Sequence, residues 1–186
     1  MINLRKNRSL TQRLYLIESC KINERLEREY IVMGSTGNVY HVIIKNSPVC
    51  NCPDYKQRNN RCKHIYFILI RIMNINNPDK YEYNDDDLEN MFKNIPEITN
   101  YLQVSHDVKQ NYQKIKNKKI SKDLDDFCPI CLDELENGEN IVTCKFSCGR
   151  HVHELCFDML NRNKTNTECI YCKHSWDEEK YINLVA

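Results

Sequence analysis

The sequence predicts an α+β protein built from small zinc-stabilised modules that a polar linker joins. Two observations lead to this prediction. The cysteines gather in closely spaced pairs, with seven of the eleven between residues 128 and 172 and three more between residues 50 and 62. The larger of these segments, residues 127–176, has only about fifty residues, too few to bury the apolar surface that folding without metal requires.

Length and composition describe an ordinary soluble protein. The 186 residues leave room for one domain or for two or three small ones, and the content is 41% hydrophobic and 28% charged. The net charge of +1 gives no global field for nucleic acid or a membrane. No apolar stretch follows the charged first residues, and the run 65–70 is too short to span a bilayer. We therefore expect an intracellular protein of the cytoplasm or nucleus, neither secreted nor membrane-spanning.

The larger cysteine-rich segment holds four pairs of metal-ligand residues. A C-x(2)-C pair lets two thiolates converge on one tetrahedral zinc from a tight turn. Without a secretory signal, such spacing favours reduced, metal-bound thiolates over disulfides. Eight ligands make two zinc sites, which consecutive pairs or alternate pairs could form. The pairs are Cys128 with Cys131, Cys144 with Cys148, His153 with Cys156, and Cys169 with Cys172.

The smaller segment predicts a third zinc site. Its C-x-C and C-x-H pairs, nine residues apart, offer three thiolates and one imidazole. Two strand-like runs, Glu29 to Met33 and Val39 to Lys45, precede it, and the loop 34–38 supplies glycines for a hairpin turn. A helix that is apolar nearly all round, and hence buried, should follow over residues 64–73. The four ligands of this site are Cys50, Cys52, Cys62 and His64.

Outside the metal clusters the patterns are simpler. Apolar residues between Ser9 and Glu18 recur at helical spacing and predict a short amphipathic helix that packs on the next module. Cys20 is expected to be a small packing residue, because nothing near it resembles the base that a thioester-forming nucleophile needs. Asp85 to Asp87 should begin a capped helix, with acid at its positive end.

These patterns divide the chain into five parts. Residues 1–28 form the N-terminal helical segment, 29–95 the first zinc module, 96–124 a lysine-rich linker, 125–178 the second module and 179–186 a C-terminal tail. The linker is expected to be solvated and partly helical.

Both modules resemble known zinc fingers. The smaller segment is similar to a SWIM zinc finger, through residues 34–40, 52–54 and 62–65. The larger resembles a RING finger, through the x(3), x(4), x(2) spacing of its middle ligands. Together they resemble the ubiquitin ligases that carry both fingers, over about residues 9–94 and 125–178.

The resemblance implies an interleaved cross-brace in the second module. One zinc would bind Cys128, Cys131, His153 and Cys156, and the other Cys144, Cys148, Cys169 and Cys172. A PHD-like finger shares this cross-brace and is the nearest alternative. His151 could replace His153, and His174 repeats the Cys-Lys-His spacing of the first module.

The resemblance also implies a function. A RING-type ubiquitin-protein ligase forms no covalent intermediate, but positions a ubiquitin-charged conjugating enzyme for transfer to a substrate lysine. At the family's docking positions this chain has Ile130, Leu160 and Ile170, where relatives often have Trp at the second and Pro at the third. Lys173 would support catalysis where many active members have arginine, whose planar fork it lacks.

These departures leave a second function open. A zinc-finger adaptor, with a PHD-like or inactive RING, would bind protein or nucleic acid without transferring ubiquitin. In either case the SWIM finger would be the interaction module, and we expect a protein substrate rather than nucleic acid or a membrane as its partner. The only candidates for nucleic-acid contact are Tyr55, Lys56, Arg58 and Arg61, too few for a basic aromatic patch.

Overall fold

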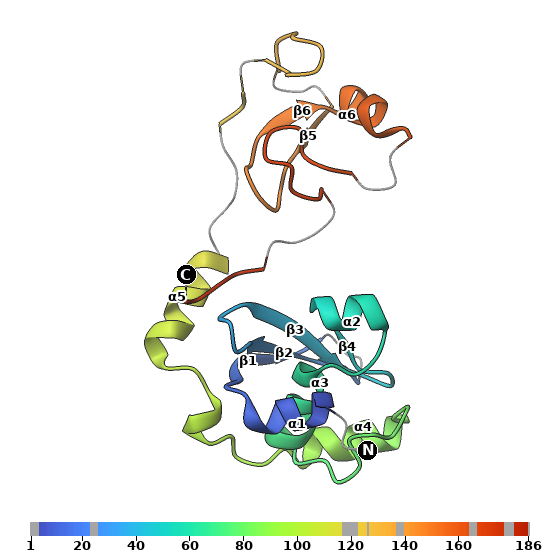
Figure 1. The fold of residues 1–186 in the computed structure, drawn as a ribbon, viewed down its shortest axis with the longest axis vertical. Helices are drawn as coiled ribbons and strands as arrows, with labels where there is room; N and C mark the ends of the chain where they lie inside the picture. The colour runs from blue at the N-terminus through green and yellow to red at the C-terminus, as the bar shows by residue number, and fades with distance from the viewer. Residues whose placement is uncertain are drawn as a thin grey trace. The chain divides into compact units, whose positions relative to one another are not determined.

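The protein forms two compact units that mix helices and strands, as the sequence predicts (Figure 1). The first unit comprises Met1–Lys116 with Tyr181–Ala186, and the second comprises Asn117–Lys180. The computed structural model describes residues 4–22, 26–116, 123–125, 127–136, 140–163, 167–176 and 181–185.

A four-stranded antiparallel sheet organises the first unit, with its strands in chain order. The predicted hairpin is confirmed: β2 pairs with β3 through the loop 34–38, in which Gly37 adopts a positive φ of 84°. Val and Ile side chains of β2 and β3 enter the core. The strands are β1 (Tyr15–Lys21), β2 (Arg28–Met33), β3 (Val39–Ile44) and β4 (Val49–Cys50).

The predicted helix from Ser9 to Glu18 is wrong. Helix α1 spans Leu4–Thr11, and the chain then enters strand β1. Leu10 is 50% exposed, while Leu14 and Ile17 enter two different core clusters. The three apolar residues therefore share no helical face. Pairing of β1 with β2, with a bulge after Leu16, prevails over the local helical spacing.

The predicted buried helix is confirmed, with an irregularity in its second part. It begins as the α-helix α3 (Lys63–Tyr66) and continues as the π-helix η1 (Phe67–Ile72), whose apolar side chains lie in the main core. The short helix α2 (Pro53–Arg58) lies between the two ligand pairs of the smaller cluster.

The acidic run also begins a helix, as predicted. Helix α4 (Asp85–Lys93) has a capping box, in which the Asn84 side chain accepts a bond from the Asp87 amide at 2.8 Å. The Asp87 carboxylate in turn accepts from the Asn84 amide at 2.9 Å. The turn η2 (Asn100–Leu102) follows.

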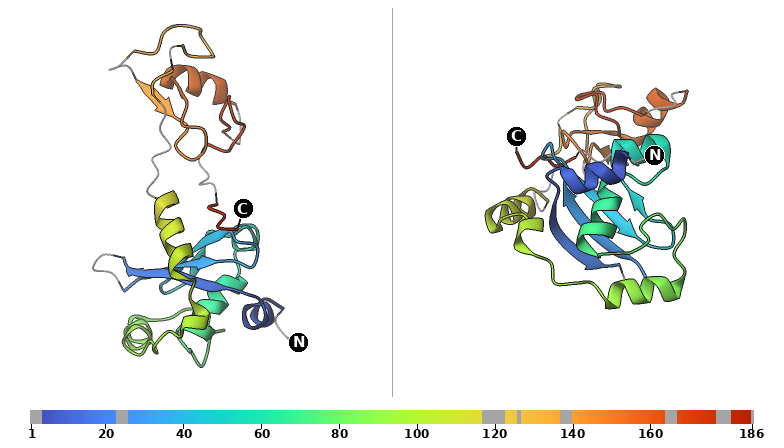
Figure 2. Two further views of the ribbon diagram at one scale, coloured as in Figure 1. Left: turned by 90° about the vertical axis from the view of Figure 1, so that its left-hand side faces the viewer. Right: turned by 60° about the horizontal axis from the view of Figure 1, so that its bottom comes forward.

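Part of the lysine-rich segment packs on the first unit. Helix α5 (His106–Lys116) lies beside the sheet (Figure 2), and its Tyr112 is 1% exposed. That ring contacts a small cluster made by Ile17, Ile31 and Val39. Burial raises the pKa of the Tyr112 hydroxyl. The C-terminal half of α5 is thus tied to the sheet by this aromatic side chain and by Lys116, whose ammonium pairs with Glu18 of β1 at 2.9 Å.

The second unit is small. It contains a two-stranded sheet of β5 (Ile141–Thr143) and β6 (His151–His153), followed by helix α6 (Glu154–Asn161). Among the described residues, its buried apolar cluster consists of Cys128, Leu135 and Val152, with partly buried residues packed around it. Such a core needs further stabilisation. Among the helices of the described residues, none is long and apolar enough to cross a membrane.

Candidate metal centres

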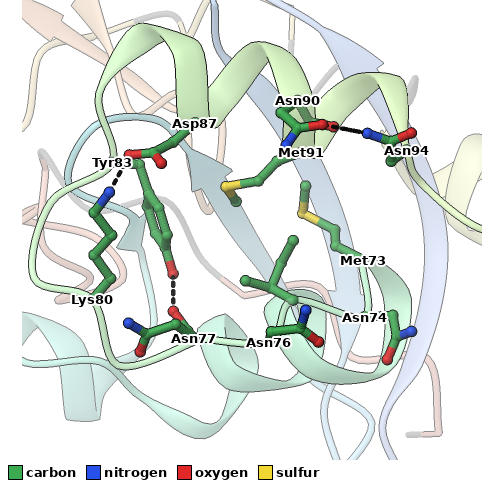
Figure 3. Close-up of a pocket in the computed structure, with 11 residues that line it drawn as sticks. Met73, Asn74, Asn76, Asn77, Lys80, Tyr83, Asp87, Asn90, Met91 and Asn94 are labelled. Carbon is green, nitrogen blue, oxygen red and sulfur yellow. Dashed lines mark hydrogen bonds and ion pairs between the residues drawn. The ribbon is translucent and has the colours of Figure 1, made fainter.

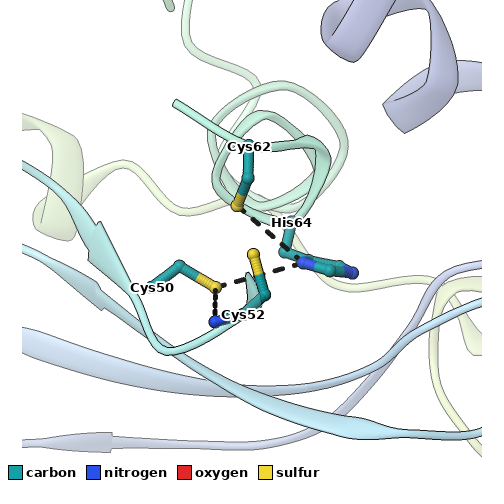
Figure 4. A group of neighbouring side chains, drawn as sticks. All are labelled: Cys50, Cys52, Cys62 and His64. Carbon is teal, nitrogen blue, oxygen red and sulfur yellow. Dashed lines mark hydrogen bonds between the residues drawn. The ribbon is translucent and has the colours of Figure 1, made fainter. Parts of the chain in front are cut away.

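The first unit brings together the four ligand residues that the sequence predicts (Figure 4). Their ligand atoms lie within 4.8 Å of one another, and all four side chains are buried. The His64 Nδ1 atom lies 4.0 Å from the Cys50 sulfur and 3.8 Å from the Cys62 sulfur. The end of β4, the turn before α2 and the start of α3 hold these side chains, so three separate elements converge on one point.

The electrostatics of this cluster favour a bound cation. Burial, followed by the neighbouring thiols, raises the pKa of Cys50. Hydrogen bonds from the Cys50 and Cys62 thiols lower the pKa of Cys52. The Cys50 thiol lowers the pKa of Cys62, but the Cys52 sulfur and burial prevail and raise it to about 12. Burial thus disfavours the joint ionisation of these thiols, and a bound divalent ion would stabilise them as thiolates.

His64 is held in a defined orientation. Burial lowers its pKa, which keeps the imidazole neutral as a metal ligand must be. Its ring stacks on Tyr40 with centroids 4.3 Å apart. With Nδ1 directed at the thiols, Nε2 has no hydrogen-bond partner among the described residues. The imidazole is thus oriented by ring packing.

Substituting Gly34 should loosen this packing. A Cβ atom there would lie 2.8 Å from the Tyr40 ring and 3.4 Å from His64 Nε2. Because both rings are buried, we expect Gly34→Ala to destabilise the first unit by about 1–3 kcal/mol and to weaken its zinc affinity. Chemical denaturation and competition with a chromogenic chelator would measure both effects. Thr36→Ala, an exposed change in the same loop, should alter neither; equal stability of the two variants would contradict the packing argument.

The second unit contains two further clusters, formed from alternate pairs. One consists of Cys128, Cys131, His153 and Cys156, and the other of Cys144, Cys148, Cys169 and Cys172. In the first, the Cys131 sulfur lies 3.3 Å from His153 Nδ1. In the second, the Cys148 and Cys169 sulfurs are 3.6 Å apart. This arrangement is the interleaved cross-brace, and it removes the consecutive pairing that spacing alone left open.

Three of the four pairs are held by the same turn. In each, the residue after the second cysteine has a left-handed backbone: φ is 67° at Leu132, 70° at Gly149 and 59° at Lys173. Its amide donates to the carbonyl of the first cysteine at 2.8–3.0 Å. The amide of that first cysteine donates to the carbonyl of the residue after the left-handed one, as the Cys169 amide does to the His174 carbonyl. The repeated turn directs two sulfurs at one point. In the sequence, only the spacing of the ligands indicates this turn.

Hydrogen bonds lower the pKa of one thiol in each of the two clusters. Burial opposes ionisation of Cys128, but backbone amides, among them those of Cys131 and His153, lower its pKa to about 7. Burial likewise opposes ionisation of Cys172, but hydrogen bonds from Ser147 and the His174 amide lower its pKa to about 6. Each cluster therefore favours one thiolate before any metal binds, whereas burial and neighbouring thiols raise the pKa values of Cys156 and Cys169 to about 12.

The competing histidines lie outside the clusters. His151 is 8% exposed, and its Nδ1 atom lies 3.4 Å from a carboxylate oxygen of Asp125, which also accepts from the His151 amide at 2.9 Å. His153, two residues on, directs its nitrogen at the sulfurs instead. His174 contributes a backbone carbonyl to the Cys169 turn and no ring nitrogen to a cluster.

Cys20 is not the packing residue that we expect from the sequence. It is exposed on β1, with its sulfur 3.6 Å from a carboxylate oxygen of Glu29. Partial burial and the charge of Glu29 raise the pKa of its thiol, which disfavours a nucleophilic thiolate. Strand β1 places this side chain at the surface beside Glu29 of β2, a placement that local spacing could not predict.

The proposed docking residues lie at the surface of the second unit. Ile130 and Ile170 are partly buried against its core cluster, and Leu160 is partly exposed on α6. Lys173 is exposed. Leu155 and Met159 lie one turn apart on α6 and are 75% and 74% exposed, so this helix carries an apolar surface that the sequence analysis did not single out. Their i, i+4 spacing was the available signal.

The candidate residues for nucleic-acid contact are largely engaged within the first unit. Arg61 donates to the carbonyls of Pro78 and Lys80, and Arg58 lies 3.6 Å from Asp54. Lys56 lies over the ring of Tyr181, and Tyr55 packs against the core. These side chains therefore form no open basic patch.

A pocket of about 300 Å³ lies between the end of η1 and α4 (Figure 3). Its polar groups bond to one another: Lys80 pairs with Asp87, and the Tyr83 hydroxyl donates to the Asn77 carbonyl at 3.3 Å. Asn94 donates to the Asn90 carbonyl at 2.9 Å. The pocket therefore resembles a solvated packing gap. None of its lining residues belongs to a cysteine cluster.

Comparison with known protein families assigns both units. Residues 40–73 match the family model of the SWIM zinc finger, and residues 126–173 match that of the Ring finger domain. The chain carries a SWIM zinc finger and a RING finger. The SWIM finger lies in the first unit and the RING finger in the second. The three clusters offer cysteine and histidine donor sets that suit zinc.

Several curated proteins are similar to this chain. E3 ubiquitin-protein ligase Zswim2 of Mus musculus is 25% identical over 155 residues, 77% of this chain and 25% of that protein. ZSWIM2 of Homo sapiens is 26% identical over 145 residues, 72% of this chain and 22% of that protein. Mitogen-activated protein kinase kinase kinase 1 of Homo sapiens is 21% identical over 208 residues, 97% of this chain and 13% of that protein. The chain thus spans a quarter or less of these relatives, and no solved structure matches it.

Proposed function

We propose that this protein is a RING-type ubiquitin-protein ligase. The observation that carries the proposal is the RING finger match over residues 126–173, together with two interleaved cysteine–histidine clusters in those residues. The names of the two ZSWIM2 relatives support it. In this function the RING finger holds a ubiquitin-charged conjugating enzyme, and ubiquitin passes to a lysine of a protein substrate. The SWIM finger is the interaction module.

The proposed RING surface combines apolar docking with one cation. Ile130, Leu160 and Ile170 would contact the conjugating enzyme, and each has a partly exposed side chain for this purpose. Lys173 follows the last ligand in a left-handed turn, which projects it from the end of the cluster into solvent. The rate gain would come from positioning and from fixed charge, since no residue forms a covalent intermediate.

Zinc would have a structural role in all three clusters, with one ion in each and twelve ligand residues in total. None of the eleven cysteines forms a disulfide. Because zinc ligation requires free thiolates, we propose a reducing intracellular compartment for the protein.

Truncating Ile130 should test the docking surface. We expect Ile130→Ala to slow self-ubiquitination about tenfold or more, because losing a central apolar contact costs an interface about 2 kcal/mol. The assay uses the full chain against a panel of conjugating enzymes, with zinc content measured in parallel. Ile141→Ala is the matched control, since Ile141 also packs partly buried on the same core cluster. If the zinc-loaded wild type transfers no ubiquitin with any enzyme, the adaptor function replaces the ligase.

Lys173 offers a second test within the same surface. An arginine presents the planar fork that bridges two acceptors, so Lys173→Arg should raise the transfer rate and Lys173→Ala should lower it severalfold. Both substitutions place a non-glycine residue at a φ of 59°, so backbone strain does not distinguish them. Single-turnover discharge of a charged conjugating enzyme onto free lysine would measure the rates. Equal rates for alanine and arginine would show that the cation has no role.

A further inference from the structure

The segment Tyr181–Val185 returns from the second unit and lies on the first (Figures 1 and 2). The Val39 amide donates to the Ile182 carbonyl at 2.8 Å, and the Leu184 amide donates to the Gly37 carbonyl at 3.0 Å. Asn38 and Asn183 form an antiparallel bridge. The segment therefore lies extended along the loop and the first residue of β3, in the manner of an added strand.

Alternate side chains of the segment enter different parts of the surface. Ile182 and Leu184 pack on the apolar cluster that Tyr112 of α5 completes. Tyr181 lies on the opposite side, where its ring is 5.2 Å from that of Tyr40 and its hydroxyl donates to the Asn51 carbonyl at 2.5 Å. The surface thus has an apolar side for two aliphatic residues and an aromatic side for one tyrosine.

Asn183 fixes the register of the segment. Its amide nitrogen donates to the Asn38 side-chain oxygen at 2.7 Å and to the Thr36 carbonyl at 3.2 Å. Its side-chain oxygen accepts from the Val185 amide at 2.9 Å. The segment also requires the glycine beneath it, because a Cβ at Gly37 would lie 2.3 Å from a methyl group of Val185. Loop and segment fit each other closely at this point.

The sheet is complete without this segment. Strand β3 already has β2 on one side and β4 on the other, and among the described residues the segment adds two backbone bonds, at the first residue of β3 and in the preceding loop. Residues 181–184 are only partly buried, and Val185 is 73% exposed. The contact therefore has the size of a docked peptide and not of an integral strand.

We propose that the hairpin loop 36–39, with Tyr40 and Tyr112 beside it, is a peptide-binding site of the first unit, next to the SWIM finger, and that Tyr181–Val185 fills it intramolecularly. A protein partner would present an extended segment of the same chemistry, with an aromatic residue, then aliphatic residues on either side of an asparagine. The proposal rests on the proposed role of the SWIM finger as the interaction module and is independent of ubiquitin transfer. A tethered segment competes at a millimolar effective concentration, so a partner must bind tightly or be multivalent.

The test compares the full chain with a variant that lacks residues 181–186. The probe is a fluorescent peptide with the sequence of residues 177–186, and its anisotropy reports binding. We expect the shortened chain to bind the peptide saturably. The affinity of the full chain for the peptide should be lower by a factor of about ten or more. A peptide with Asn183→Ala should lose about tenfold in affinity, because two acceptors on the loop lose their donor.

A second variant covers the case in which the shortened chain misfolds. In the full chain, Ile182→Asp with Leu184→Asp should expel the segment from its apolar contacts and open the site. Either zinc-loaded variant that binds the peptide no better than the full chain overturns the proposal. Loss of the SWIM zinc from both variants also overturns it, since the segment would then belong to the fold. Gain of single-stranded DNA binding in place of peptide binding would point to the other class of partner and overturn it as well.

Discussion

Replacing Cys62 with serine is expected to remove zinc from the SWIM finger and to unfold most of the first unit. Cys62 is fully buried at the start of α3, and its sulfur is one of the four donors of the cluster. Without the metal, three buried thiol and imidazole groups lose the cation that stabilises them. The α3–η1 helix that follows belongs to the main core, so the loss spreads from the cluster into that core. We expect a cost above about 4 kcal/mol, a large part of a typical domain's stability.

Two measurements separate this effect from general damage. Zinc content should fall from one ion in each of three clusters to two ions per chain. Trp176, the only tryptophan, packs against Phe157 in the second unit with ring centroids 4.1 Å apart, so its fluorescence should not change. Cys20→Ser is the matched control, because Cys20 is exposed and outside every cluster. A Cys62→Ser protein that retains all its zinc would show that the cluster is no metal site.

The ligand pairs could be predicted from the sequence because metal coordination imposes local spacing, whereas the interleaved pairing of the RING clusters came from the family resemblance. A pair such as Cys50 and Cys52 can converge on one ion only from a tight turn, so its chemistry is visible within a few residues. The β2–β3 hairpin was visible for a similar reason, since its loop needs a residue such as Gly37 at positive φ. Both features are decided by short-range geometry.

Strand β1 and the packing of helix α5 on the sheet could not be predicted because distant contacts decide them. The apolar residues of β1 also fit a helical spacing, and only pairing with β2 selects the strand. In the lysine-rich segment, Tyr112 was one apolar residue among many polar ones, and its contact with Ile17 and Val39 spans most of the first unit's sequence. A local sequence pattern does not indicate whether contacts with a sheet will select the helical or the extended conformation of such a segment.

The return of Tyr181–Val185 to the hairpin loop illustrates the same limit. By its sequence, this short segment is expected to form a tail. The hydrogen bond between Asn183 and Asn38 joins residues that lie after and before the RING finger in the sequence. The left-handed turns at Leu132 and Lys173 are a different case. They follow from the cysteine pairs that precede them, so knowledge of this turn would have predicted them from spacing.

Replacing Cys172 with serine is expected to disrupt both RING clusters, although it belongs to only one of them. In the cross-brace, the chain passes from Cys131 of one cluster to Cys144 and Cys148 of the other before it returns at His153. Strand β5 ends next to Cys144, and β6 ends at His153, so the β5–β6 hairpin joins the two clusters directly. With so small an apolar core, the unit has little else to hold the first cluster in place once the second is lost.

Trp176 and zinc release together distinguish this outcome from a local defect. In Cys172→Ser, the Trp176 emission should shift to longer wavelength as its contact with Phe157 is lost, and ubiquitin transfer should cease. The cluster that contains Cys172 should hold no zinc. The affinity of the Cys128 cluster for its zinc, measured by competition with a chromogenic chelator, should fall about tenfold. Cys62→Ser is the reciprocal control, since it should leave the Trp176 emission native. If consecutive ligand pairs shared a zinc instead, the cluster containing Cys128 would not depend on the one containing Cys172. It would then keep its zinc at the original affinity. A Cys172→Ser protein with native emission and one tightly held RING zinc would therefore contradict the cooperative cross-brace.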